Sequence, residues 1–272
     1  MKYFESLPSP NLRHYIKCFW SLEQSAVEAG DSREPVLPDG RAEIVFNLSD
    51  RFRKFQTETE FELQPRTLVA GQMTRNIVIG PSGDIKLFGV RFQPMGAFYF
   101  FGFPMSELTN RIENLLTLDK SRDRCLEDQL MDAADFAQRI AIVEAAMSKR
   151  LAVATSFDKK FAGSVDALAT MGECVSVPRL ASLLGWSERK LERDFKKYVG
   201  VSPKMFSRIS RFASIVRSLE TFGPAKLLEH AHRYGYYDQS HMINEFRGFA
   251  GESPTAFYQR SHRLSELFTV GD

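Results

Sequence analysis

Cysteine and histidine are both scarce in this chain, and their scarcity excludes several classes of site. The three cysteines, Cys18, Cys125 and Cys174, lie far apart and show no Cys-x-x-Cys spacing. Such a set favours reduced thiols in the cytoplasm over a disulfide framework or a zinc site. None of the five histidines falls within residues 15–229. A metal-dependent enzyme with a His-rich centre in that region is therefore disfavoured.

The chain also lacks the marks of membrane insertion, of secretion and of the common catalytic loops. Its most apolar stretch, Phe88–Phe103, is interrupted by Arg91, Gln93 and Pro94 and is too short to cross a bilayer. No basic segment followed by an apolar run stands at the start, so we expect no secretory signal. Gly-x-Ser-x-Gly, P-loop and Gly-rich dinucleotide patterns are missing as well. We therefore expect a cytoplasmic protein that is not an enzyme, with no catalytic residue, no metal and no cofactor.

Charge is distributed unevenly along the sequence. A length of 272 residues predicts two domains. The net charge is +2, but residues 149–272 carry +6 and residues 1–148 carry −4. Within 187–217, nine basic residues stand against three acidic ones. A basic stripe on a nearly neutral protein favours a polyanionic partner, and a solvated helix face is the alternative left open by charge alone.

The C-terminal third contains an internal repeat. The pattern Gly-x-Ser-Pro-x-x-Phe occurs at 200–206 and returns at 251–257, and a phenylalanine, Phe195 or Phe246, precedes each glycine by the same interval. Further upstream, Ala181 matches Ala231 and Gly185 matches Gly235. Two copies of one structural unit account for this pattern better than chance.

The first copy predicts a helix, a tight turn and a second helix. An apolar face over 177–184 ends at Gly185, which suits a helix C-terminus that needs a positive φ. Ser187 is placed to cap a helix over 187–198 whose outward side is cationic. Ser202 and Pro203 then begin a joining helix over 203–221.

The second copy repeats this order with other residues. A helix is expected over 225–234, followed by a turn at Gly235. Asp238 is placed to cap a helix over 238–249, whose inward stripe is Met242 and Phe246. Ser253 and Pro254 open a last short helix.

These two copies resemble the DNA-binding domain of the AraC/XylS family of bacterial regulators. The resemblance rests on Leu-Ala-x-x-Leu-Gly-x-Ser at 180–187, Leu-x-x-x-Phe-Lys-Lys-x-x-Gly-Val-Ser-Pro at 191–203 and Gly-Tyr-x-Asp-Gln-Ser-His at 235–241. Two departures, Met242 and the pair Gly248-Phe249, predict that the second unit grips the DNA backbone less firmly than the first.

The resemblance implies that helices 187–198 and 238–249 enter successive major grooves on one face of promoter DNA, held apart by the joining helix. The residues expected to read bases are Arg189, Glu192, Arg193, Lys196, Gln239, His241 and Asn244. The residues expected to contact phosphates are Lys197, Lys204, Arg208 and Arg247.

The first 120 residues have the character of a β-rich domain. Alternating patterns at 41–48 and 84–92, with shorter ones at 61–63 and 77–79, predict strands. Helices are expected over 95–101, 106–116, 121–133 and 135–154, the last as a surface for dimerisation or packing. This order suggests a small barrel or sandwich with a helical appendage.

This region is similar to the cupin-like sensory domain that precedes many such DNA-binding domains. The similarity rests on Leu-Pro-Asp-Gly-x-x-Glu-Ile-Val-Phe-Asn-Leu at 37–48 and Phe-Gly-Val-Arg-Phe-Gln-Pro-Met-Gly-Ala at 88–97. It implies binding of a small effector, dimerisation or both. The effector candidates are Trp20, Glu43, Phe46, Phe88, Arg91 and Tyr99.

The fold expected from the sequence is of the α+β class. It has a small cupin-like β-barrel with a helical appendage at 1–120, a helical connector and linker at 121–163, and an all-α DNA-binding domain at 164–272. The function expected is sequence-specific transcription regulation, as an effector-responsive activator. Expected partners are double-stranded promoter DNA, RNA polymerase, a small molecule and a second copy of the chain, with no membrane. The alternative left open is a small-molecule-binding protein whose helix-turn-helix pair serves protein contacts.

Overall fold

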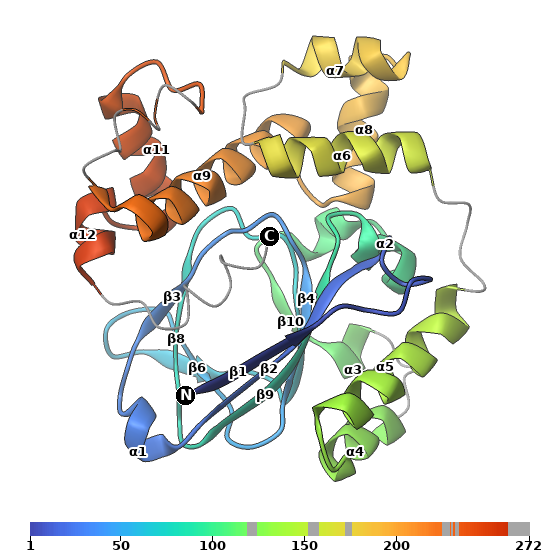
Figure 1. The fold of residues 1–272 in the computed structure, drawn as a ribbon, viewed down its shortest axis with the longest axis vertical. Coiled ribbons are helices and arrows are strands. Elements are labelled where there is room, and N and C mark those ends of the chain that lie inside the picture. The colour runs from blue at the N-terminus through green and yellow to red at the C-terminus, as the bar shows by residue number, and fades with distance from the viewer. Residues whose placement is uncertain are drawn as a thin grey trace.

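The computed structural model describes residues 1–118, 124–151, 158–171, 176–224, 229, 231 and 234–260. Most of the helix expected over 225–234 and part of the connector, 119–123 and 152–157, lie outside the described residues. Figure 1 shows a β-rich N-terminal domain with helices along one side and an all-helical C-terminal region across one end.

The N-terminal domain is built from two antiparallel sheets. The six-stranded sheet has the order β1 (Lys2–Ser6), β2 (Ile16–Gln24), β9 (Ile85–Phe92), β4 (Glu43–Asn47), β7 (Thr67–Ala70) and β10 (Ile112–Asn114). The four-stranded sheet has the order β3 (Glu34–Val36), β8 (Ile77–Gly80), β5 (Arg53–Phe55) and β6 (Phe61–Leu63). Strand pairing within residues 1–118 does not close these sheets into one barrel. The expected barrel is therefore a pair of packed sheets.

Alternation along the central strands sends side chains to two different cores. On the inner face Trp20 of β2 and Leu87 of β9 pack with Ile79 of β8. On the outer face Phe19, Phe46 and Phe88 belong to the large core that the helices cover.

Gly89 shows how tight the inner face is. It pairs with Trp20 across β2 and β9. A Cβ added at Gly89 would stand 2.0 Å from Cε2 of the Trp20 indole. Only a residue without a side chain lets the ring lie this close to the strand.

Most helices of the N-terminal half lie against the outer face and around the connector, whereas Ala29 of the first one belongs to the inner core. The helices are α1 (Ala26–Ala29), α2 (Gly96–Phe101), the 3-10 helix η1 (Met105–Leu108), α3 (Leu115–Leu118), α4 (Arg124–Asp132) and α5 (Phe136–Leu151). The prediction of a single helix over 106–116 is wrong. In its place η1 ends at Leu108, β10 follows and pairs with β7, and α3 begins after β10. Asn110 has a φ of 60°, which stops a right-handed helix, and its N–H donates to the carbonyl of Gln72.

The described part of the C-terminal region is helical, and four of its helices begin at the caps predicted from the sequence. Its helices are α6 (Lys159–Met171), α7 (Val177–Leu184), α8 (Glu188–Tyr198), α9 (Pro203–Phe222), α11 (Gln239–Ala250) and α12 (Pro254–Gln259). Ser187, Ser202, Asp238 and Ser253 each accept a backbone N–H at the start of the following helix, as the sequence predicted. Gly185 has the expected positive φ of 71° after α7.

Helix α6 begins inside the segment expected to be linker. Its Phe161 is buried, and the Phe161 ring lies 5.0 Å from the Trp186 ring and 5.4 Å from the Phe195 ring. The first helix-turn-helix unit therefore includes a supporting helix that starts at Lys159, before the boundary expected at 164.

Two apolar cores divide the C-terminal region. The core of the first unit, with Leu184, Leu191 and Phe195, is continuous with the outer core of the N-terminal domain. The second unit packs Met242 and Phe246 against the distal part of α9 in a second core, which also includes Leu37 of the N-terminal domain. No helix within the described residues is long and apolar enough to cross a membrane.

Candidate DNA-binding surface and effector cavity

Helix α8 presents a cationic surface along its outward side. Arg189, Arg193 and Lys196 are exposed, and Glu192 is half-buried. The Arg193 side chain is 69% exposed, although its Nε donates to Asp194 Oδ1 at 3.1 Å. The inward side of the same helix buries Leu191 and Phe195. Three of the four residues expected to read bases thus lie on the exposed side of α8, and Glu192 lies at its half-buried edge.

Asp194 binds two basic side chains of the same helix, Lys190 and Arg193. Lys190 Nζ donates to Asp194 Oδ2 at 2.5 Å, one helical turn away. Burial raises the pKa of the Asp194 carboxyl, but the hydrogen bonds from Lys190 and Arg193 outweigh it and hold the pKa below its usual range. The carboxylate therefore stays ionised and orients the long side chains around it.

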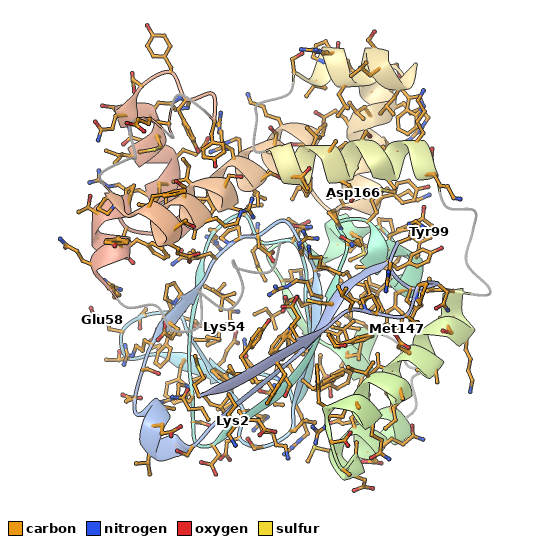
Figure 2. The ribbon with its side chains drawn as sticks, viewed as in Figure 1. Lys2, Lys54, Glu58, Tyr99, Met147 and Asp166 are labelled. Atoms are coloured by element: carbon orange, nitrogen blue, oxygen red, sulfur yellow. The ribbon has the colours of Figure 1, made fainter. Side chains whose placement is uncertain are left out.

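The C-terminal end of α8 rests on the N-terminal domain. The Tyr198 ring lies 4.4 Å from the Phe98 ring and 6.2 Å from the Tyr99 ring of α2. Figure 2 shows Tyr99 on the side of the N-terminal domain that faces the C-terminal helices. Thr109 Oγ1 donates to the carbonyl of Gly200 at 2.6 Å. Lys197, expected at a phosphate, is exposed, with Nζ 5.2 Å from the centre of the Phe98 ring. The first recognition helix is therefore fixed at one end and open at the other.

Helix α11 carries the corresponding surface of the second unit. Gln239, His241, Asn244 and Arg247 are all exposed. The helix begins at the Asp238 cap, which accepts the N–H of His241 at 2.7 Å. This surface is polar with a single basic residue among the four, in contrast to the cationic surface of α8.

A buried ionic network joins α11 to α9. Glu245 Oε1 accepts from Arg211 Nη2 at 2.6 Å and from the Tyr236 hydroxyl at 3.0 Å, and Glu245 Oε2 accepts from Arg208 Nε at 2.8 Å. Burial raises the pKa of Glu245, but the hydrogen bonds from Arg208 and Arg211 outweigh it, so the net shift is downward. Arg208, expected at a phosphate, has this internal partner and a side chain that is 37% exposed, whereas Lys204 is exposed.

Sequence reasoning missed the role of Glu245, although the repeat contains a signal for it. An acid stands directly before the buried phenylalanine in both copies, as Asp194-Phe195 and Glu245-Phe246. Each acid forms ion pairs with two basic side chains. Their partners differ: those of Asp194 come from α8 itself, and those of Glu245 come from α9.

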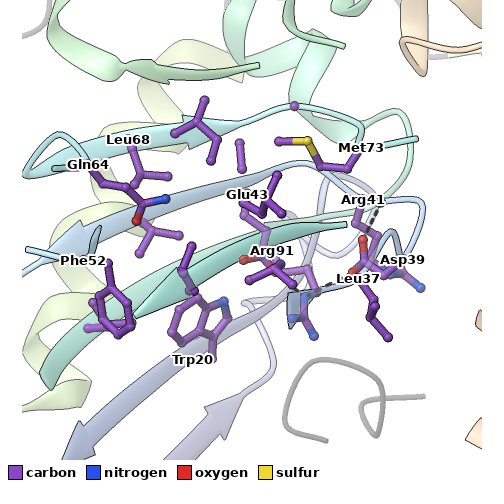
Figure 3. A pocket seen from close by; sticks show the side chains of 18 of the residues that line it. Trp20, Leu37, Asp39, Arg41, Glu43, Phe52, Gln64, Leu68, Met73 and Arg91 are labelled. Carbon is purple, nitrogen blue, oxygen red and sulfur yellow. Dashed lines mark hydrogen bonds and ion pairs between the residues drawn. The ribbon is translucent and has the colours of Figure 1, made fainter. Parts of the chain in front are cut away.

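A cavity opens between the two sheets of the N-terminal domain (Figure 3). It holds about 780 Å³ of empty space, including the solvent at its open side. Its walls are mainly apolar, and polar groups enter from β4, β9 and the segment before β4. Of the effector candidates, Trp20, Glu43 and Arg91 line this cavity.

A buried ion pair lies in the cavity wall. Arg91, which is 3% exposed, donates from Nε to Glu43 Oε1 at 2.5 Å and stands 3.9 Å from Asp39 Oδ2. Burial alone would lower the pKa of Arg91, but Glu43 and Asp39 raise it above its ordinary value. Burial raises the pKa of Glu43, and Arg91 counteracts part of that rise.

The other three effector candidates lie on the far side of the sheet. Phe46 and Phe88 pack against each other with ring centres 6.0 Å apart, and Phe88 lies 5.9 Å from Phe136 of α5. Tyr99 lies at the junction with α8, where burial raises its pKa to about 12. The structure thus brings half of the predicted set together at the cavity and places the other half in the outer core.

Among the described residues, no group of three or more His, Cys, Asp or Glu side chains is arranged to hold a metal ion. The four charged side chains at the cavity are two acids and two arginines, a set suited to internal ion pairs.

Comparison with known proteins assigns two regions of the chain. Residues 180–260 match the model of a helix-turn-helix domain, and residues 4–114 match a domain of unknown function, DUF6597. No curated protein matches the sequence.

Solved structures of ToxT from Vibrio cholerae have a similar overall arrangement. A ToxT structure in the P21 form shares 9% identity over 89% of this chain and 98% of that chain, with a TM-score of 0.48. ToxT bound to unsaturated fatty acid shares 8% over 88% and 93%, with a TM-score of 0.46. ToxT bound to (E)-4-(8-methylnaphthalen-1-yl)but-3-enoic acid shares 11% over 88% and 97%, with a TM-score of 0.47. These scores lie below 0.5, so the similarity is distant.

The helix-turn-helix match covers both repeat copies, whose caps, turns and buried stripes fall in register. The chain carries a helix-turn-helix domain and is a DNA-binding transcription regulator.

Proposed function

We propose that this regulator reads two successive major grooves through α8 and α11 and responds to a small molecule held between its two sheets. The observation that carries the DNA part is the exposure of both predicted reading surfaces on helices joined by one straight spacer. Helix α9 has 20 residues, which corresponds to about 30 Å at 1.5 Å per residue. One turn of B-DNA separates equivalent grooves by about 34 Å.

The network around Glu245 supports this reading. It ties α11 to α9 through two arginines, one of them Arg211 with a side chain 5% exposed. A recognition helix must keep its angle to the spacer if both units are to meet DNA together. The ionic network supplies a directional link where apolar packing alone would leave the angle less defined.

The unequal surfaces suggest a division of labour. Arg189, Arg193 and Lys196 on α8 can neutralise phosphates as well as bind guanine, whereas Gln239 and Asn244 on α11 suit adenine. We expect the first unit to contribute most of the affinity and the second to tune the choice of sequence.

Selection of bound duplexes from a random library, followed by footprinting, tests the DNA proposal. Two protected segments about one helical turn apart are expected on one face of the duplex. Affinity should fall steeply as salt rises, because phosphate contacts release counterions. An affinity that does not change with salt would contradict the proposed phosphate contacts. Failure to bind any sequence would favour the alternative in which the helix pair serves protein contacts.

The effector part rests on the segment between β3 and β4. Leu37, Asp39 and Arg41 line the cavity. Leu37 also belongs to the core of the second unit, and a Cβ on Gly40 would stand 3.2 Å from Phe206 of α9. One short segment thus contacts both the cavity and the spacer helix. A ligand that moves it would change how the two DNA-reading helices are held.

We further propose an activator that acts beside RNA polymerase in the cytoplasm, where chromosomal DNA is accessible, and that binds DNA as a monomer or as a homodimer. A promoter–reporter assay in cells with and without the regulator distinguishes activation from repression. Analytical ultracentrifugation of the full chain, alone and with the selected duplex, gives the number of copies that bind.

A further inference from the structure

The cavity between the sheets is polar at two separate places and apolar between them. On β4, Glu43, Val45 and Asn47 all line the cavity. Strands advance by about 3.3 Å per residue, so the backbone positions of Glu43 and Asn47 lie about 13 Å apart. Figure 3 shows Glu43 beside Arg91 and, further along, Gln64 beside Phe52 and Leu68. The space therefore suits an elongated molecule.

The end at Glu43 carries acidic and basic side chains in equal number. Asp39 and Glu43 stand against Arg41 and Arg91, so the formal charges cancel. Arg91 is engaged by Glu43 and lies near Asp39, and Arg41 Nη1 donates to Gln93 Oε1 at 3.1 Å. A carboxylate entering here would lose its hydration and meet two acids, while an ammonium group would meet two arginines.

The end at Asn47 contains a buried hydrogen-bond acceptor. Asn47 is 1% exposed, and its Nδ2 donates to the carbonyls of Pro65 and Arg66, both at 3.1 Å. These two bonds fix which way the amide faces. Its Oδ1 is buried and has no hydrogen-bond partner among the described residues. A buried carbonyl oxygen left without a donor is costly, so a bound molecule that supplies an N–H or O–H is favoured here.

The apolar walls between these ends define the rest of the ligand. Side chains such as Leu68, Ile79 and Leu87 come from both sheets and surround the space between Glu43 and Asn47. They match a hydrocarbon chain or flat apolar skeleton and leave polar groups in the middle of a ligand without partners.

We propose that the cavity binds an elongated, uncharged, largely apolar molecule whose polar end donates a hydrogen bond to Asn47, such as a fatty alcohol or fatty primary amide, in preference to the carboxylate of the same chain. This assignment rests on the proposed effector role of the cavity and names the chemistry that the role requires. It also assigns Asn47, which the sequence did not single out, as the residue that selects the ligand.

A matched set of probes tests the assignment on the full chain. Isothermal titration calorimetry is performed with octanol, octanamide, octanoate and methyl octanoate. The alcohol and the amide can donate a hydrogen bond, the ester cannot, and the carboxylate adds a charge. We expect octanol and octanamide to bind at least roughly tenfold more tightly than the other two, because only they satisfy Asn47 without bringing in a charge.

Three variants locate the effect. Asn47→Leu should abolish the preference for the alcohol over the ester. Glu43→Gln removes one of the two acids beside Arg91 and should raise the affinity for octanoate while leaving octanol nearly unchanged. Val45→Phe fills the space between the two ends and should weaken all four probes. If Asn47→Leu does not fold, Glu43→Gln still tests the charge argument.

The outcomes separate the two proposals. Octanoate binding more tightly than octanol would overturn the ligand class and leave the cavity as an effector site. Equal binding of octanol and methyl octanoate would overturn the role of Asn47. Saturable binding that Val45→Phe does not weaken, or no saturable binding of any probe, would overturn both the ligand class and the effector role of the cavity.

Discussion

The two helix-turn-helix units descend from one sequence pattern, yet they are held in place by different means. The first shares a continuous apolar core with the N-terminal domain, and its recognition helix ends against α2. The second has another core, to which the N-terminal domain contributes Leu37, and an ionic link to the spacer helix. The acid that precedes the phenylalanine therefore forms a surface ion-pair cluster within α8 in the first copy. In the second copy it forms a buried ionic link between α11 and α9.

This difference indicates that the units divide two requirements of the regulator. The first is anchored where a signal from the N-terminal domain arrives, and its outer surface is cationic. The second is held at a fixed angle on the spacer helix by the Glu245 network. Its polar surface suits discrimination between bases and attracts DNA less strongly than the cationic surface of α8. Substitutions at equivalent positions of the two copies should therefore have unequal effects.

The largest expected effect follows replacement of the buried acid. Glu245→Ala leaves Arg211 buried without its carboxylate, which should lower the free energy of unfolding by about 3–5 kcal/mol. Thermal unfolding followed by circular dichroism measures the loss. Asn244→Ala, on the exposed side of the same helix, is the control and should change stability by less than about 0.5 kcal/mol. A loss for Glu245→Ala as small as the control would show that the network is not what holds α11.

Removing a base-reading arginine should have the next largest effect. Arg193→Ala should weaken binding to the selected duplex by about 1–3 kcal/mol and relax the preference at one base pair. Lys204→Ala should weaken all sequences alike and reduce the salt dependence by about one counterion. Fluorescence anisotropy on matched and mismatched duplexes separates the two patterns. Equal losses on every duplex for Arg193→Ala would reassign Arg193 to the phosphates.

Acid should act on the second unit through Glu245. The folded protein holds the pKa of Glu245 below its ordinary value, so the stability it contributes is complete above about pH 4.3 and is lost as the pH falls through the lower folded value. The free energy of unfolding, measured by urea denaturation at a series of pH values, should fall more steeply for the wild type than for Glu245→Gln. Parallel curves would place the acid sensitivity elsewhere.

The smallest effect is expected at the equivalent acid of the first unit. The partners of Asp194 are well exposed, Lys190 at 38% and Arg193 at 69%. Asp194→Ala should therefore cost no more than about 1 kcal/mol of stability. Urea denaturation beside Glu245→Ala gives the comparison directly. Equal losses at the two positions would remove the contrast between the copies.

The sequence predicted α7, α8, α9 and α11 to within one residue at each end because their signals are local. Ser187 and Gly185 lie within a few residues of the ends that they define, so no distant contact is needed to place them. The helix expected at 106–116 failed because β10 is held by pairing with β7, some forty residues earlier in the chain. Local propensity cannot represent such pairing.

The site was predictable to the extent that it is helical. Every reading residue expected on α8 and α11 falls on the outward side except Glu192, which is half-buried. The cavity was less accessible to sequence reasoning because the pairing of Glu43 with Arg91 depends on the register between β4 and β9. Glu245 was missed for a similar reason, since its arginines lie 34 and 37 residues away.

The packing of Trp20 on Gly89 gives this protein an optical property. The chain has two tryptophans. Trp20 lines the cavity in close contact with the strand, and Trp186 lies in the turn of the first helix-turn-helix unit, beside Phe161. With Trp186 replaced by phenylalanine, the remaining indole emission should report occupancy of the cavity. With Trp20 replaced instead, emission should report events at the DNA-binding turn. The delay between the two emission changes after ligand is added would then give the rate at which a conformational change at the cavity reaches the DNA-binding turn.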